Sequence, residues 1–194
     1  MMFFLFNILF LVLVFHFLFK GFLVVNQTEA IIVEHFGKYQ MTITAGLHFI
    51  TPFLAKTKKI NQQVKEKRSN NEIITKIVPL ERIPLSEQVY EFNLKNVQTN
   101  DCTSTDISIL LYFQITNPRR VAYCVKDFAI ALEELITTKA KQKINQYNYN
   151  DLFNYREKLD EEIKSDIKRE EQNWGLQITR IMIDEIKLSN RTNC

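Results

Sequence analysis

The sequence predicts an α+β protein, in which an N-terminal transmembrane helix precedes a curved antiparallel sheet packed with amphipathic helices. Three observations lead to this prediction. The first 25 residues form an almost unbroken apolar run, several later segments alternate apolar and polar residues, and the segments between residues 118 and 174 repeat apolar residues every three or four positions. With 194 residues, the chain has room for one globular domain besides the anchor.

The predicted anchor comprises residues 1–25. Eight of the 15 phenylalanines lie within the first 22 residues, and only Asn7 and His16 are polar between positions 1 and 19. About 20 apolar residues span a bilayer, so this segment is long enough for a membrane anchor helix. A signal peptide is the alternative, but the segment lacks a basic start and a small-residue cleavage site. The nearest basic residues, Lys20 and Lys38, favour a domain on the cytoplasmic or matrix-like side.

Strands are predicted in four segments after the anchor. "EAIIVEHFGKY" indicates a strand that ends in a turn at Gly37, and "TAGLHFITPFL" a second turn at Gly46 followed by a short strand that Pro52 ends. "SEQVYEFNLKNVQTND" indicates a strand with a bulge. The clearest strand is "STDISILLYFQITNP", whose buried face is expected to consist of Ile107, Ile109, Leu111, Phe113 and Ile115.

Helices are predicted after each of three capping residues. Asn117 precedes Pro118, a favoured first helical residue. Asp127 precedes a longer helix, and Asn154 precedes a third, with Glu157 placed as in a capping box. The apolar stripe of the longer helix comprises Phe128, Leu132, Leu135, Ile136, Ala140 and Ile144.

The third helix is unusually charged, because 12 of the 16 residues from Arg156 to Glu171 are acidic or basic. Its narrow apolar track consists of Tyr155, Leu159, Ile163, Ile167 and Trp174. Two interpretations stay open. The helix lies on the sheet by this track and solvates its other faces, or its charged flanks meet the same helix of a neighbouring copy. Gly175 is expected to end the helix at the C′ position.

The last segment, "WGLQITRIMIDEIKL", fits neither a simple strand nor a helix. Its apolar residues alternate but slip by one position at Arg180 and again at Glu185. Two β-bulges explain this pattern, because each bulge inserts a residue and restores the inward face. The residues predicted to face inward are Leu176, Ile178, Ile181, Ile183, Ile186 and Leu188.

The sequence offers no constellation of catalytic, cofactor-binding or metal-ligating residues. The net charge of +3 does not predict nucleic-acid binding, and the three cysteines are too widely spaced for a zinc site or a disulfide framework. His16, His35 and His48 have no partners at ligand spacing, and the four glycines leave no phosphate-cradling loop. An enzymatic function is therefore disfavoured. A second candidate contact with the membrane is the turn that carries Phe49, Ile50, Phe53 and Leu54.

The chain resembles the band 7 family, also called SPFH, which includes stomatins, stomatin-like proteins and prohibitins. The resemblance rests on the order of six segments and is closest to the stomatin-like members. These segments are "EAIIVEHFGKY", "AGLHFITPF", "RIPLSEQVYEF", "NVQTNDCTSTDISILLYFQITNPRRVAYCVKDF", "NYREKLDEEI" and "WGLQITRIMIDEIKL". The resemblance implies an SPFH domain over residues 26–190, followed by a short tail at 191–194.

Four departures from the family pattern bear on function. Ala45 stands where the family has a proline, and about 20 extra residues at 61–81 are expected to form an extended hairpin outside the shared core that reaches a partner. The anchor lacks the proline and cysteine that a re-entrant hairpin and palmitoylation use in plasma-membrane stomatins. The long C-terminal oligomerisation helix of the family is expected to be absent.

The resemblance implies a non-enzymatic scaffold that sits on one membrane face. Its expected partners are membrane lipids and other membrane proteins, such as subunits of a large complex or a protease, with homo- or hetero-oligomers as assemblies. The leading hypothesis is an accessory subunit of a larger membrane assembly. The alternative is a self-assembling organiser of membrane microdomains, or a regulator of a membrane protease or channel. The mitochondrial inner membrane is favoured over the plasma membrane.

Overall fold

The computed structural model describes residues 21–51, 55–67 and 73–189, together with Phe3, Asn7, Phe10 and Leu11. The region predicted as a single domain divides into two compact units. The first unit contains the described residues up to Lys59 together with Glu81–Pro84. The second contains Ile60–Leu80 and the described residues from Leu85 onward. Each unit buries its own apolar residues, so each is described by itself.

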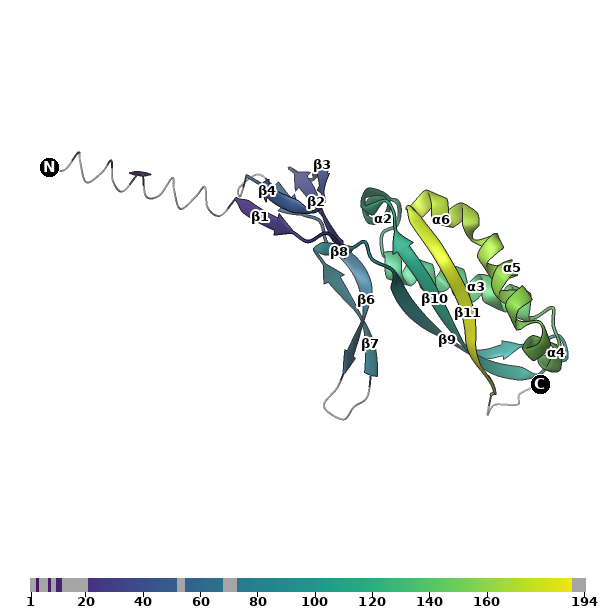
Figure 1. Ribbon diagram of the computed structural model, residues 1–194. Coiled ribbons are helices and arrows are strands. Elements are labelled where there is room, and N and C mark those ends of the chain that lie inside the picture. Colours follow the sequence, from purple (N-terminus) through teal and green to yellow (C-terminus); the bar gives the residue numbers. More distant parts are fainter. Residues whose placement is uncertain are drawn as a thin grey trace. The chain divides into compact units, whose positions relative to one another are not determined.

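The first unit is built around strand β2 (Glu29–His35), whose residues from Ala30 to Val33 are buried. Strand β2 pairs antiparallel with three neighbours, which are β3 (Lys38–Ile43), β5 (Ala55–Thr57) and β8 (Arg82–Pro84). The predicted turn at Gly37 is confirmed, and it joins β2 to β3. A two-stranded ribbon, β1 (Phe22–Val25) and β4 (Gly46–Phe49), completes the described strands of this unit (Figure 1).

The end of the predicted anchor requires a correction. Its last four residues form β1 instead of continuing a helix, because they alternate outward and inward side chains against β4. Apart from Gly21 and four isolated positions, the rest of the anchor predicted over residues 1–25 lies outside the described residues. Within the part of the chain that the structure describes, no helix has the length and apolarity needed to cross a membrane.

The second unit contains a three-stranded antiparallel sheet in the order β11–β10–β9. Its strands are β9 (Gln88–Gln98), β10 (Ser104–Ile115) and β11 (Leu176–Leu188). The predicted strict alternation in β10 is confirmed, and its inward residues pack in an aromatic core in which the rings of Phe113 and Tyr90 lie 4.8 Å apart. Figure 1 shows helices α3 (Phe128–Ile144), α5 (Arg156–Asp166) and α6 (Lys168–Trp174) on one side of this sheet.

The helix boundaries confirm two predicted signals and correct a third. Asn117 caps α2 (Pro118–Cys124) by accepting a hydrogen bond from the Arg120 amide, and Gly175 ends α6 in the left-handed conformation. Asn154 is not an N-cap, because it is the last residue of the short helix α4 (Tyr149–Asn154). The predicted third helix is also divided at Ile167 into α5 and α6.

Strand β11 contains the two predicted bulges, each one residue earlier than the sequence pattern suggested. The register with β10 skips Thr179 and Asp184. Leu176, Ile178, Ile181 and Ile183 are buried as predicted, and Ile186 is half-buried. The prediction is wrong for Leu188, which is 58% exposed. Because the first residue of α5 contacts Asp184, this helix does not extend over the end of the strand.

The predicted hairpin at residues 61–81 is confirmed, but its expected position outside the core is wrong at its base. Strands β6 (Ile60–Lys67) and β7 (Ile73–Leu80) pair antiparallel along their whole length. At the base, Ile60 and Gln62 are buried. The amide of Gln63 donates to the hydroxyl of Tyr90 at 3.0 Å, and burial raises the pKa of Tyr90 to about 12. The first residues of β6, at the base of the hairpin, therefore belong to the folded second unit.

The charged residues of α5 and α6 have a structural use that neither sequence interpretation anticipated. Strand β11 is an edge strand, and charged side chains from the two helices bind its outward backbone groups. Two carboxylates accept hydrogen bonds from strand amides: Glu171 from Ile178 at 2.6 Å and Asp160 from Ile183 at 3.0 Å. Two cations donate to strand carbonyls: Lys164 to Thr179 at 2.6 Å and Arg156 to Asp184. An edge covered in this way does not offer a free template for another strand.

Asp160 makes the stability of this edge dependent on pH. Burial raises the pKa of its carboxyl from 3.8 to about 6. A raised pKa means that the native state binds the proton of Asp160 more tightly than the unfolded state does. The contribution of this proton to the stability of the native state is therefore fully present below about pH 4 and is lost as the pH rises through about 6. Asp160→Asn keeps the acceptor for the Ile183 amide and removes the charge. We expect the variant to be more stable at pH 7.5 by about 1 kcal/mol, after discounting for partial exposure.

Thermal denaturation of the detergent-solubilised protein at both ends of this pH range checks the prediction. The difference in melting temperature between Asp160→Asn and the wild type should disappear near pH 4. A variant that is less stable than the wild type at pH 7.5 would show instead that the ionised carboxylate stabilises the edge. Ser165→Ala is a suitable control, because the Ser165 hydroxyl bonds within its own helix and not to β11.

Candidate membrane-interface surface

The β1–β4 ribbon of the first unit begins where the apolar N-terminal segment ends. The Ile50 amide donates to the Gly21 carbonyl at 2.7 Å and closes the ribbon at this end. From there, Phe22 lies opposite Phe49, and Val24 lies opposite Leu47. Because side chains alternate along a strand, these two cross-strand pairs lie on one face of the ribbon.

The inner face of the ribbon packs on the core of the first unit. Val25 is 3% exposed and joins a buried cluster with Ile31, Val33 and Ile43, and Leu23 and Ile50 pack against this cluster. The ribbon is therefore held by ordinary apolar burial on one side. This packing leaves the side chains of the opposite face directed outward.

The outer face of the ribbon is apolar and exposed. The exposed fractions are 52% for Phe22, 63% for Val24, 65% for Leu47 and 53% for Phe49. The rings of Phe22 and Phe49 meet edge to face with their centroids 5.5 Å apart. Single exposed apolar residues are ordinary on protein surfaces, but four on one face of a short ribbon indicate a contact surface. We call these four residues the ribbon face.

Gly21 allows the aromatic pair to approach the backbone. A Cβ atom at Gly21 would lie 2.4 Å from a ring carbon of Phe49 and 2.8 Å from the Ile50 carbonyl oxygen. Such distances are not found between non-bonded atoms, so a side chain at this position would displace the ring. The glycine thus fixes both the strand start and the position of Phe49.

The four residues predicted to contact the membrane are not all exposed on one surface in the structure. Phe49 belongs to the exposed ribbon face. Ile50 is half-buried and packs on the core cluster, so its predicted interface role is not supported. Phe53 and Leu54 lie outside the described residues.

Three residues of the ribbon face, Phe22, Val24 and Leu47, were not predicted. The sequence pattern assigns Phe22 and Val24 to the anchor, because they continue the apolar run that precedes them and the run hides where the strand begins. The signal that could have revealed them is the short β-branched end of this run, which lies just before the polar turn at Asn26.

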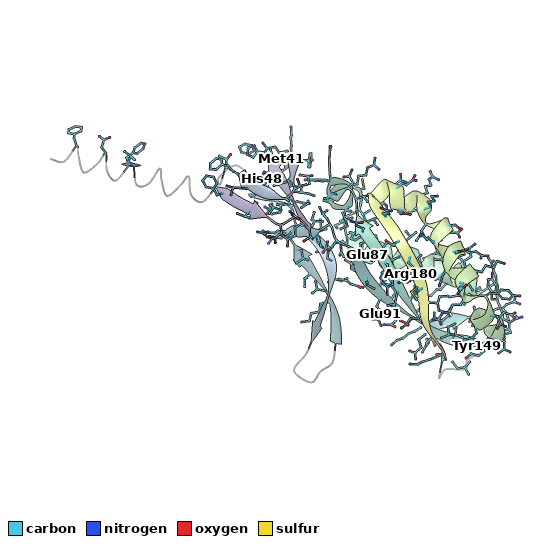
Figure 2. The ribbon with its side chains drawn as sticks, in the orientation of Figure 1. Met41, His48, Glu87, Glu91, Tyr149 and Arg180 are labelled. Atoms are coloured by element: carbon cyan, nitrogen blue, oxygen red, sulfur yellow. The ribbon has the colours of Figure 1, made fainter. Side chains whose placement is uncertain are left out.

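Outside the ribbon face, several described polar side chains that could carry chemistry have assigned contacts. In the described ranges, no group of three or more His, Cys, Asp or Glu side chains is placed to hold a metal ion. His48, which Figure 2 labels, lies on the inner row of β4. Its Nε2 bonds to the Thr44 carbonyl at 2.9 Å. Arg180 lies over the Tyr112 ring at 4.7 Å on the exposed side of the second sheet. A hollow between α5 and β11 is lined by the residues that cover the strand edge, such as Asp160 and Lys164.

The fold and the ribbon face together define a class of protein, an α+β domain that presents an apolar surface directly after an apolar N-terminal segment. The chain belongs to the SPFH domain / Band 7 family, whose model matches residues 23–193. The resemblance inferred from the sequence motifs is thereby confirmed.

Relatives of this chain include two stomatin-like proteins. Stomatin-like protein stl-1 of Caenorhabditis elegans is 25% identical over 167 residues, which cover 86% of this chain and 45% of the relative. Stomatin-like protein 2, mitochondrial, of Bos taurus is 25% identical over 169 residues, which cover 87% of this chain and 41% of the relative. An uncharacterised protein of Methanothermobacter thermautotrophicus is also 25% identical, with 87% and 46% covered. The chain thus spans less than half the length of these relatives.

Proposed function

We propose that this protein is a non-enzymatic, membrane-anchored scaffold whose ribbon face lies in the interfacial region of the bilayer. One observation carries the proposal, namely the four exposed apolar side chains on the β1–β4 ribbon, whose first strand begins directly after the N-terminal segment of residues 1–20. Membrane lipids are then the first partner of the chain. The anchor supplies attachment, and the ribbon face fixes how the first unit meets the surface.

The energy available from the ribbon face is appreciable. Complete burial of a large apolar side chain contributes about 1.5–3 kcal/mol. Since about half of each side chain in the ribbon face is exposed, we estimate about 1 kcal/mol for each, or about 4 kcal/mol for the four. This energy is too small for irreversible attachment but sufficient to orient a unit that is already tethered.

For the kind of scaffold, we favour an accessory subunit of a larger membrane assembly over a self-assembling organiser of membrane microdomains. Four of the charged side chains of α5 and α6 that were candidates for contact with a second copy are instead engaged with β11 of the same chain. This observation weakens the sequence argument for homotypic contact through that helix. The alternatives are a self-assembling organiser and a regulator of a membrane protease or channel. A size measurement after detergent extraction distinguishes the self-assembling organiser from the accessory subunit.

For the location, we propose the mitochondrial inner membrane rather than the plasma membrane. The support is twofold. One relative carries the description mitochondrial, and the N-terminal sequence lacks the proline and cysteine expected of a plasma-membrane stomatin anchor.

The test of the proposed function separates the anchor from the ribbon face. Deleting residues 1–20 leaves Gly21 and β1 in place, and we expect this variant to become extractable by carbonate while it keeps a weak, reversible binding to phosphatidylcholine vesicles that flotation detects at high lipid concentration. Adding Val24→Ser and Leu47→Ser should then abolish flotation, because these two residues are the most exposed of the ribbon face and do not disturb the aromatic pair.

The control replaces two exposed apolar residues of the second unit, Val89→Ser and Ile130→Ser, which are 40% and 44% exposed. These substitutions should leave flotation unchanged. The proposal is wrong if the deletion variant stays in the carbonate pellet, or if the control pair reduces flotation as much as the ribbon pair does.

A further inference from the structure

The hairpin of β6 and β7 leaves one strand edge open. Among the described residues, β6 is the only strand that pairs with β7, so the opposite edge of β7 has no neighbouring strand (Figure 1). The edge of β11, by contrast, is covered by charged side chains of α5 and α6. An open strand edge presents a row of unpaired backbone amides and carbonyls, which can bind a further strand.

The contact of β6 with Tyr90 shows which backbone groups of β7 lie on this edge. The Gln63 amide donates to the Tyr90 hydroxyl at 3.0 Å, so it points away from β7. Gln63 pairs with Ile77, and the two residues of such an antiparallel pair both turn their amide and carbonyl outward. Because the pairs alternate and the register has no shift, Ile73 and Thr75 also turn their amides and carbonyls to the outer edge of β7.

The position of Pro79 agrees with this orientation. It lies two residues after Ile77, so the amide that a proline lacks would also have been on the outer edge. The hairpin therefore loses no hydrogen bond to β6 at this position. The donors of the open edge lie between Ile73 and Ile77, and among the described residues no group outside the hairpin bonds to the amide or carbonyl of Ile77.

The residues of β7 suit the addition of a strand. Five of the eight residues from Ile73 to Leu80 are β-branched, which favours an extended backbone. The side chain of Ile77 is 41% exposed and offers an apolar contact beside the open amide. Bulges commonly protect strand edges, but none interrupts the register of β7 with β6. The edge thus combines open backbone groups with regular strand geometry.

The charge of the hairpin indicates what kind of strand fits this edge. The segment from residue 60 to residue 80 contains four basic and two acidic residues, which gives it a net charge of +2. The basic residues are Lys65, Lys67, Arg68 and Lys76, and the acidic residues are Glu66 and Glu72. A second copy would bring the same positive charge to the shared edge, and like charges on paired strands are unfavourable. An acidic segment of a different protein would instead be attracted.

From these observations we propose that the outer edge of β7 binds an extended acidic segment of a partner protein as an added β-strand. The backbone of the segment bonds to the amides and carbonyls of Ile73, Thr75 and Ile77, and its acidic side chains lie near the basic residues of the hairpin. In this mode of recognition main-chain bonds provide affinity, and side chains provide selectivity. The proposal rests on the accessory-subunit role proposed above and names the kind of partner segment that this role requires.

Hydrogen exchange measured by NMR on the full chain in detergent tests this proposal. The probe is a capped synthetic peptide in which glutamate and valine alternate. At a peptide concentration of about ten times the Kd, exchange of the Thr75 and Ile77 amides should slow about tenfold, because the bound molecules are protected. A peptide of alternating lysine and valine should give little protection, and high salt should weaken binding of the acidic peptide.

The substitution Ile77→Pro removes the outward amide and keeps the hairpin bonds, in the same way as the natural Pro79. We expect it to weaken binding of the acidic peptide by about tenfold or more, measured at the Thr75 amide, since one lost hydrogen bond alone accounts for up to about tenfold. Ile77→Val is the matched control, because valine is close in size to proline and keeps the amide. The inward amides of Val64 and Lys76 should stay protected in both variants, which shows that the hairpin is intact.

Three results would overturn the proposal. They are absence of protection by the acidic peptide, equal protection by the basic peptide, and equal peptide binding by Ile77→Pro and Ile77→Val. Protection of the Thr75 and Ile77 amides that rises with protein concentration in the absence of peptide would show that a second copy occupies the edge. That result would overturn the assignment of a different protein as the partner.

The proposed function has its own readouts, which are the flotation of the deletion variant and the size after detergent extraction. Ile77→Pro should leave flotation unchanged, since β7 does not belong to the ribbon face. Flotation without peptide protection would retain the membrane contact and reject the strand-edge site alone. Peptide protection in a chain that forms homo-oligomers would retain the site and reject the accessory-subunit role.

Discussion

Replacing Ile183 by lysine should destabilise the second unit by several kcal/mol, whereas the same substitution at the neighbouring Met182 should be tolerated. Ile183 is 1% exposed beneath the helices, and Met182 is half-buried on the other side of the sheet. An unpaired charge in the core costs several kcal/mol, a large share of the roughly 5–15 kcal/mol by which a domain is stable. Urea denaturation followed by circular dichroism measures both changes in the free energy of unfolding.

The two bulges of β11 determine which of these residues is buried. A strand with uninterrupted alternation from Leu176 would place Met182 inside and Ile183 outside. A greater loss of stability for Met182→Lys than for Ile183→Lys would therefore contradict the bulged register. Leu188→Lys provides a further comparison, since Leu188 is apolar yet 58% exposed and should tolerate the charge.

Replacing Gly175 by alanine is expected to cost about 3 kcal/mol or more. Gly175 has a φ of 75°, and a Cβ atom there would lie 2.7 Å from Cβ of Asn117 and 2.8 Å from its carbonyl oxygen. The left-handed conformation alone costs an alanine about 1–2 kcal/mol, and relief of the contacts would move Gly175 away from Asn117 at the start of α2. The Gly175 carbonyl accepts hydrogen bonds from the Thr116 amide, the Thr116 hydroxyl and the Asn117 amide, so all three would be disturbed.

Gly37→Ala is the matched control for this substitution. Gly37 has nearly the same φ, 76°, but a Cβ atom there would meet no other atom within 4 Å. We expect a loss of only about 1–2 kcal/mol, which is the conformational cost alone. If thermal denaturation gives equal losses for the two variants, the contact of Gly175 with Asn117 does not contribute to stability.

The sequence alone was sufficient for features that depend on neighbouring residues. The alternation in β10, the cap at Asn117 and the left-handed glycine at 175 were all predicted correctly, because each is set by the conformational preference of a few adjacent residues. The two bulges of β11 were also predicted, because the apolar pattern slips wherever a bulge inserts a residue. Their positions were wrong by one residue, since the pattern does not show which of two polar neighbours is the inserted one.

Tertiary structure decided the features that depend on residues distant in the sequence. Asp160 and Ile183 are 23 positions apart in the sequence. The sequence pattern therefore could not show that charged side chains of α5 bind the edge of β11. The ribbon face likewise exists only because Phe22 and Val24 pair with Phe49 and Leu47. Apolar periodicity shows that a residue prefers to leave water, but pairing across the chain determines whether it is buried in the protein or remains exposed for a partner.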